Sequence, residues 1–216
     1  MIKLFIAAAM TIVLSGTTAI AAQNGTFRQA HEYGYGDKSS LDPASRGRVM
    51  QITEKLMSRL IRPDMKGSPS PDLATSWSSN DEATVWTLNL REGVKFHDGS
   101  GFDSGDVIYT FSRVLDPENK SPARSAIKMI EKMEAPDDMT VKFTLSTPFA
   151  DMPLQLMDYR LRIIPENSGD SIATSGIGTG PFKLVSYDAA GVTKLDANMD
   201  CLLYTSPSPR DWRVSR

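Results

Sequence analysis

The sequence contains very little cysteine and histidine. Among 216 residues, Cys201 is the only cysteine, so the chain cannot form an internal disulfide. Two histidines and one cysteine are too few for a Cys/His zinc site. The motifs GxSxG, HExxH and CxxC are also absent. The sequence therefore predicts no metal site, no cofactor and no catalytic residue, and we expect the protein not to be an enzyme.

A strong charge of either sign is missing as well. Lys and Arg total 24 and Asp and Glu total 26, which gives a net charge of −2 at pH 7. Proteins that bind nucleic acids or anionic membranes usually carry a basic excess. We therefore expect no nucleic-acid partner, and we expect the protein to be a monomer.

The only long apolar run is too short to cross a bilayer, which takes about 20 residues. It covers residues 4–14, follows Lys3, and precedes an Ala-Ile-Ala cleavage pattern at residues 19–21. We interpret residues 1–21 as a secretory signal peptide; the alternative is an uncleaved membrane anchor. Thr17 stands where a lipobox needs its cysteine. The sequence therefore predicts a periplasmic protein without a lipid anchor.

Apolar residues recur with both helical and strand periods. The expected helices are residues 47–60, ended by Pro63; a helix capped by Asp103; one containing Ile127, Ile130 and Met133; and residues 150–157. The expected strands are residues 26–34, 85–91, 139–146 and 181–185. The stretch from Lys66 to Trp77 is rich in turn residues. Because no strict βαβ rhythm appears, we expect an α/β fold of mixed α+β type.

The segment "VWTLNLREGVKFHDG" poses a choice between a chemical site and a turn. His97-Asp98 could be half of a catalytic or metal site. However, no partner nucleophile or second ligand is spaced for it, and Asp98-Gly99 is a typical turn pair. We predict a hairpin that buries Trp86, Leu88, Leu90, Val94 and Phe96, and whose tip leaves His97 exposed and dispensable.

The best candidate binding segment is "EYGYGDKSS", residues 32–40. Its glycines let a ligand approach the backbone, its tyrosines offer flat contact area, and a carboxylate could pair with a ligand amine. A plain surface turn is the alternative. A second candidate is "GIGTGP", residues 176–181, which we read as a hinge-side turn and not a phosphate loop, since a strand follows it. The candidate ligand-binding residues are Glu32, Tyr33, Gly34, Tyr35, Asp37, Ser39, Gly178 and Thr179.

Three quoted segments occur in a recognisable order. They are "SLDPAS", "PDLATSWSSNDEATVWTLNLREGVKFHDGSGFDSGDVIYTFSRVLDP" and "GIGTGPFKLVSYDAAGVTKLDAN". Together they resemble family 5 of the bacterial extracellular solute-binding proteins, over residues 26–198. The resemblance implies a two-lobed fold of the periplasmic binding protein class II type. It implies that this chain holds only the first lobe and its inserted subdomain, because family members are much longer.

The resemblance also implies domain boundaries. Residues 24–46 and 175–198 would belong to an incomplete first lobe, and residues 47–174 to its inserted subdomain. Residues 199–216 do not continue the family pattern. They read as a non-native tail, like translated sequencing-adapter DNA, or as a disordered one.

The function implied is the substrate-binding component of an ABC importer that delivers a peptide to inner-membrane permease subunits. Dipeptides and oligopeptides are the first expectation. Alternatives are a receptor for an opine, an oligosaccharide or a nickel complex, and a secreted ligand-sensing adaptor. A secreted hydrolase is a further hypothesis, which the absence of any spaced nucleophile and base argues against.

Overall fold

The structure is a computed structural model that describes residues 39–47, 49–189 and 191–201. All of these lie in the second of two compact units of the chain, residues 34–216. The predicted signal peptide and the strand at residues 26–34 fall outside the described residues. Of the predicted tail, Met199–Cys201 are described: Cys201 is buried, and its backbone N–H donates to the carbonyl oxygen of Asn198 (3.1 Å).

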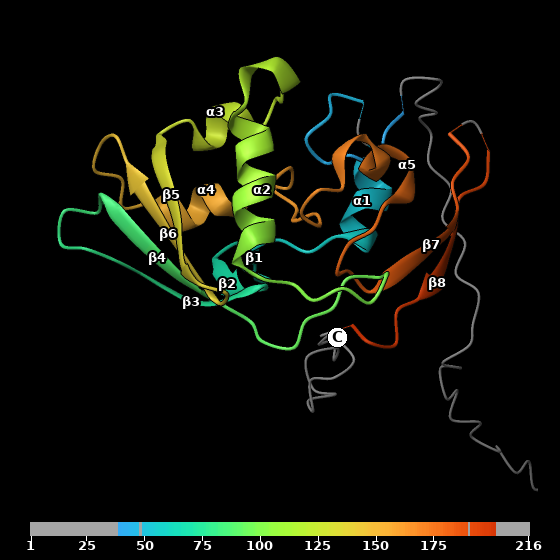
Figure 1. The fold of residues 1–216 in the computed structure, drawn as a ribbon, viewed down its shortest axis with the longest axis horizontal. Coiled ribbons are helices and arrows are strands. Elements are labelled where there is room, and N and C mark those ends of the chain that lie inside the picture. Colours follow the sequence, from blue (N-terminus) through green and yellow to red (C-terminus); the bar gives the residue numbers. More distant parts are fainter. Residues whose placement is uncertain (1–38, 48, 190, 202–216) are drawn as a thin grey trace, which may run out of the picture. The chain divides into compact units, whose positions relative to one another are not determined.

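The largest element is an antiparallel four-stranded sheet of order β3-β4-β6-β5 (Figure 1). Its strands are β3 (Ala74–Ser79), β4 (Val85–Leu90), β5 (Ile130–Asp137) and β6 (Thr140–Leu145). In β6 every second side chain is buried, and β4 alternates similarly. One face of the sheet therefore packs against helices, among them α2 (Ser104–Leu115), α3 (Arg124–Ile127) and α4 (Met152–Leu156).

Helix α2 forms where its cap and its apolar stripe agree. The Asp103 carboxylate accepts the N–H of Gly105 (2.7 Å), and Asp106 accepts the N–H of Asp103 (2.9 Å), which completes a capping box. Val107, Phe111 and Val114 are buried at helical spacing. The Phe111 ring stacks on Phe143 of β6 with ring centroids 5.1 Å apart. The predicted helix and its cap are confirmed.

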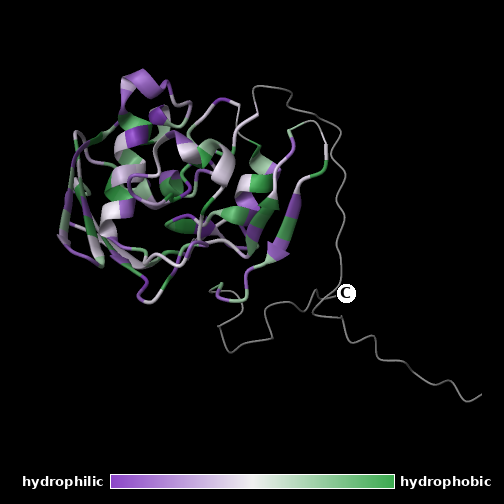
Figure 2. Ribbon diagram, turned by 45° about the vertical axis from the view of Figure 1, so that its right-hand side comes forward, coloured by the Kyte–Doolittle hydropathy of each residue, from purple (hydrophilic) through white to green (hydrophobic). Residues whose placement is uncertain are grey.

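A smaller apolar cluster lies beside this core. It involves α1 (Met50–Leu56), α5 (Ile172–Ser175) and the antiparallel pair β7 (Phe182–Ser186) and β8 (Lys194–Ala197). The buried members of the cluster are Leu41, Leu56, Met57, Ile164 and Ile172. Two short strands, β1 (Ile61–Pro63) and β2 (Pro69–Pro71), pair with each other, and 3-10 turns η2 (Pro117–Asn119) and η3 (Gly169–Ser171) complete the elements. Green hydrophobic residues are interspersed with purple hydrophilic ones along the helices and strands (Figure 2).

The first helix is shorter than predicted. It ends at Leu56, because Met57 takes an extended conformation, and Leu60 packs into the larger cluster instead of continuing the helical face. Pro63 lies in β1, where the two-stranded ribbon leaves room for a residue without an N–H donor. The stretch from Lys66 to Trp77, read as turns, contains β2 and the start of β3.

Two further predictions about local structure are wrong. Ile130 and Met133 lie in β5, so only α3 remains of the helix predicted there. The strand β4 pairs with β3 and β6, and not with residues 94–97. Val94 and Phe96 are nevertheless buried as predicted, along with the apolar residues of β4. The strands β4, β6 and β7 and helix α4 are confirmed to within a residue or two.

None of the helices within the described residues is long and apolar enough to cross a membrane. In the same part of the chain, no three His, Cys, Asp or Glu side chains gather closely enough to hold a metal ion.

Candidate functional site

The glycines of "GIGTGP" let the chain lie directly against the end of α1. A side chain at Gly178 would overlap the carbonyl oxygen of Leu56, and one at Gly180 would stand 2.5 Å from the carbonyl carbon of the same residue. The N–H of Gly180 donates to that carbonyl oxygen at 2.8 Å. These glycines are therefore required by close backbone approach.

His97 ties the turn before α2 to this glycine loop. The backbone N–H of His97 donates to the carbonyl oxygen of Gly178 (2.9 Å). In return, the backbone N–H of Gly178 donates to Nδ1 of the His97 ring (3.2 Å). The ring Nε2 lies 3.1 Å from the carbonyl oxygen of Gly180. Since Nδ1 accepts, Nε2 carries the proton, and the ring is a neutral bridge between two backbone groups.

Burial of the His97 ring lowers its pKa, and the positive charge of Lys183 acts in the same direction. The hydrogen bond to Gly180 and the nearby Asp98 carboxylate oppose this shift. The side chain is half-buried, so the prediction that His97 is exposed is wrong. The reason is the approach of the glycine loop, which lies more than 80 residues further along the chain.

The turn itself is confirmed. The Asp98 carboxylate accepts the N–H (3.0 Å) and the hydroxyl (2.7 Å) of Ser100, and Gly99 has φ +91°, in the left-handed region that favours glycine. The hydrogen bonds from Ser100 lower the pKa of Asp98. The Asp98 carboxylate is thus used locally to hold the turn.

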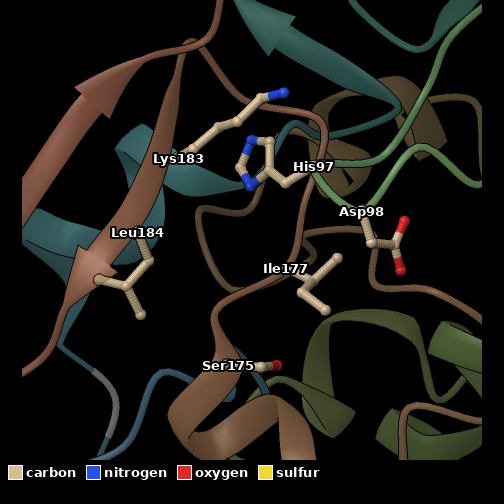
Figure 3. A pocket seen from close by; sticks show the side chains of 6 residues that line it. All are labelled: His97, Asp98, Ser175, Ile177, Lys183 and Leu184. Atoms are coloured by element: carbon tan, nitrogen blue, oxygen red, sulfur yellow. The ribbon is translucent and has the colours of Figure 1, made fainter.

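A hollow of about 280 Å³ opens between this turn and β7 (Figure 3). Its lining side chains are His97, Asp98, Ser175, Ile177, Lys183 and Leu184. It thus contains a serine, a histidine and an aspartate, the residue types of a nucleophilic triad.

The arrangement of these three side chains is not that of a triad. A general base must present a free ring nitrogen to the serine, and an acid must bind the other nitrogen. Here both ring nitrogens of His97 are already hydrogen-bonded to the backbone, Nδ1 to Gly178 and Nε2 to Gly180. The Asp98 carboxylate is hydrogen-bonded to Ser100 and not to the ring. The hollow therefore offers a rigid polar wall and no activated nucleophile.

The described part of the chain contains three of the residues predicted to bind ligand. Ser39 is half-buried and lies near Tyr187, whose pKa is raised by burial. Gly178 lies in the loop beside His97. Thr179 is only 2% exposed, and its hydroxyl has no hydrogen-bond partner within the described residues. The other five candidates lie outside the described residues: Glu32, Tyr33, Gly34, Tyr35 and Asp37.

Sequence reasoning missed a buried arginine, Arg162, beside the half-buried Arg59. Arg162 is 4% exposed and donates through Nη1 to the carbonyl oxygen of Met57 (2.6 Å), and it faces Arg59 in an isolated antiparallel bridge. Burial and the charge of Arg59 lower the pKa of Arg162 to about 10. Asp72, whose pKa is raised by burial, accepts the backbone N–H of Arg59 (3.0 Å). Arginine residues this far apart carry no sequence signal of their contact.

Comparison with known proteins gives a consistent class. The chain is 34% identical over 128 residues to the glutathione-binding protein GsiB of Pectobacterium atrosepticum. The aligned region covers 57% of this chain and 25% of GsiB. It is 31% identical over 156 residues to the di/tripeptide-binding protein 2 of Pseudomonas aeruginosa, covering 60% of this chain and 29% of that protein. The chain thus spans between a quarter and a third of these relatives' length.

Solved structures show the same fold. The periplasmic binding protein AgaA of A. tumefaciens R10, in complex with agropinic acid, matches 78% of this chain and 35% of its own with a TM-score of 0.70 and 31% identity. The periplasmic binding protein DppA of Helicobacter pylori, in complex with the peptide STSA, matches 76% and 38% with a TM-score of 0.67 and 28% identity. The fold is therefore the mixed α/β fold of the periplasmic binding proteins.

The family follows from a match that covers most of the chain. Residues 68–209 match the model of the bacterial extracellular solute-binding proteins, family 5. This chain belongs to that family. The predicted resemblance and fold class are confirmed.

Proposed function

We propose that this chain is part of the substrate-binding component of an ABC importer whose solute is a peptide. The observation that carries the proposal is the family match over residues 68–209. The relatives' names support the peptide class: one is a glutathione-binding protein and another a di/tripeptide-binding protein. The solute would pass to permease subunits in the inner membrane.

Other solutes remain candidates on specific grounds. Two of the matching structures hold agropinic acid and a nickel–histidine complex. An opine or a nickel complex is therefore the second candidate, and the solute panel of the experiment includes both. An oligosaccharide receptor and a ligand-sensing adaptor share this fold, and a pull-down of membrane partners would separate the adaptor from a receptor.

The protein would act in the periplasm as a monomer, after removal of residues 1–21. It would bind its solute without changing a covalent bond. The occupied ring of His97 supports this, because it leaves the histidine of the hollow unable to activate a nucleophile. Residues 24–46 and 175–198 would form one lobe and residues 47–174 its inserted subdomain.

The solute contacts would come from the loop before Ser40 and from the glycine loop. In the first, Glu32 or Asp37 would pair with an amine, and Tyr33 and Tyr35 would supply flat apolar surface. In the second, Thr179 has a buried hydroxyl without a hydrogen-bond partner in the described part of the chain, a group that native proteins seldom leave unpaired. Ser39 and the backbone of Gly178 would complete the contacts.

Calorimetric titration tests the proposal. A panel of Ala-Ala, Ala-Ala-Ala, glutathione, agropinic acid and nickel–histidine is titrated into the 216-residue chain and into the product of the complete reading frame. We expect the longer product to bind a peptide and this chain to bind weakly, because receptors of this type close both lobes over the solute. Mass spectrometry should show the peptide unchanged. Binding of no solute by the longer product, or cleavage of the peptide, would refute the proposal.

A further inference from the structure

A second hollow, of about 470 Å³, opens at the other end of α2. It is bounded by the loop before α1, the last turn of α2, the 3-10 turn η2 and the 3-10 turn η3. The lining residues that matter here are Asp42, Arg46, Arg113, Asn119, Lys120 and Asp170. In chain order they are far apart, so the fold alone brings their charges together.

Positive charge prevails in this hollow. Three cationic side chains line it against two carboxylates. The negative charge of Asp42 is offset within the protein, because its carboxylate accepts the N–H of Ala44 (2.8 Å) and pairs with Nη2 of Arg113 (3.0 Å). That ion pair is largely buried, with side chains 16% and 14% exposed. Among the described lining residues, Asp170 is then the one remaining carboxylate beside the exposed cations Arg46 and Lys120.

Arg113 retains a donor after pairing with Asp42. Its Nη1 is buried and has no hydrogen-bond partner among residues 39–47, 49–189 and 191–201. A buried N–H group without an acceptor is costly, and native proteins seldom leave one. Since Nη1 itself is out of reach of solvent, an oxyanion in the hollow would bind the exposed cations Arg46 and Lys120, and the Arg113 guanidinium would add its charge from behind them.

The negative end of α2 does not cancel this charge. The carbonyl oxygen of Arg113 accepts the side-chain amide of Asn119 (3.0 Å), and that of Leu115 accepts Nε of Arg124 (2.9 Å). The terminal carbonyls are thus capped by donors. Lys120 is held at φ 47°, in the left-handed region, by the 3-10 turn η2, which fixes where its side chain leaves the backbone.

We propose that this hollow is an oxyanion site that takes the carboxylate of the solute. The inference rests on the proposed function, since it assumes that a solute is bound. The volume lies within the range of small-molecule sites, about 300–1,000 Å³, and exceeds what one carboxylate fills. The remainder of the hollow therefore has room for the neighbouring part of the solute.

The first experiment uses acetate, the carboxylate alone, with the 216-residue chain at constant ionic strength. Backbone amide shifts near Arg46 and Lys120 are followed by NMR. The double variant Arg46→Gln/Lys120→Gln should weaken acetate binding about three- to tenfold. The matched control is Lys66→Gln/Lys95→Gln, which removes the same charge from exposed sites outside the hollow and should leave binding unchanged.

The second experiment compares Ala-Ala-Ala with its C-terminal amide, using the longer reading-frame product. We expect the free acid to bind at least tenfold more tightly, with the difference lost in Arg46→Gln/Lys120→Gln.

The two arms separate the two proposals. The absence of saturable acetate shifts, or equal loss in both double variants, would overturn the oxyanion site. Equal binding of acid and amide would overturn its link to the solute while peptide binding stands. Acetate binding without binding of any solute would support the oxyanion site and refute the proposed function.

Discussion

The substitution His97→Ala tests the bridge between the turn before α2 and the glycine loop. It removes the Nδ1 acceptor from the N–H of Gly178 and the Nε2 donor from the carbonyl oxygen of Gly180. The carbonyl oxygen of Gly180 keeps a second donor, the side-chain amide of Asn198 at 2.9 Å. Gly178 is buried, so its N–H would lose its acceptor without gaining free access to water.

The expected loss follows from these contacts. Each intramolecular hydrogen bond contributes a net 0.5–1.5 kcal/mol or so, and a buried donor left unpaired costs about 1–3 kcal/mol. The loss of one hydrogen bond to Gly180 and of the acceptor for the buried Gly178 N–H together give a decrease of about 1.5–4.5 kcal/mol in the free energy of unfolding. An ordinary surface substitution changes it by about 0.5 kcal/mol or less.

The assay is urea unfolding of the 216-residue chain, followed by the fluorescence of Trp77 and Trp86, together with hydrogen exchange at the Gly178 amide. Lys95→Ala is the control, because that side chain is exposed in the same segment. The exchange rate at Gly178 should rise in His97→Ala alone. A loss below about 0.5 kcal/mol with unchanged exchange would refute the bridge.

The same bridge should depend on pH. Burial lowers the pKa of His97 in the folded protein, so the unfolded chain binds more protons as pH falls below the ordinary histidine value of about 6.5. The stability that the neutral ring contributes is present above that value and is lost as pH falls through the folded pKa. The stability difference between wild type and His97→Ala should therefore shrink from pH 8 to pH 5. A constant difference would contradict the assigned neutral ring.

Three other predictions can be checked separately. Asp103→Ala should cost about 1 kcal/mol of unfolding free energy in urea melts by removing the capping box of α2, whereas Asp81→Ala, exposed in a turn, should cost little. Gly178→Ala should lower soluble yield or melting temperature sharply, because its side chain would overlap the carbonyl oxygen of Leu56; Gly101→Ala, with open space around it and no positive φ, is the control. N-terminal sequencing of periplasmic protein should begin near Ala22, and an intact Met1 in the membrane fraction would contradict the predicted signal peptide.

The elements that were predicted correctly have several apolar residues in one clear period. β6 alternates over its whole length, and α2 adds a cap to its stripe. Ile130 and Met133, by contrast, are only three residues apart, a spacing too short to distinguish a helix from a strand. In the structure β6 supplies the partner that makes the segment a strand, with Met133 opposite Phe143. Pairing with a neighbour decides such segments, and sequence pattern alone does not contain it.

The candidate site was predictable only in part, for a related reason. The turn residues Asp98 and Gly99 and the close-packed Gly178 are visible as local patterns. The role of His97 depends on backbone atoms of the glycine loop, and a lone histidine on the polar side of an extended segment gives no sign of them. The charges around the second hollow likewise come together only through the placement of α2 and the loops around it.

Helix α2 connects the two apolar clusters of this unit. Its apolar stripe fills the larger cluster, while its buried polar residues serve the backbone that leads into the smaller one. The Thr110 hydroxyl accepts the N–H of Ile164 (3.1 Å), and the Asp106 carboxylate accepts the N–H of Glu166 (2.7 Å).

Buried polar side chains are costly unless they are paired, and here each satisfies a backbone group that no strand or helix serves. Burial raises the pKa of Asp106, which shows the cost of keeping its charge at this position. The Tyr109 hydroxyl continues the pattern by accepting the N–H of Gly169 (2.9 Å). One turn further along, Arg113 meets Asp42. A single helix therefore positions the loop and the 3-10 turns around the proposed oxyanion site, and of the helix side chains that make these contacts only Arg113 lines the hollow.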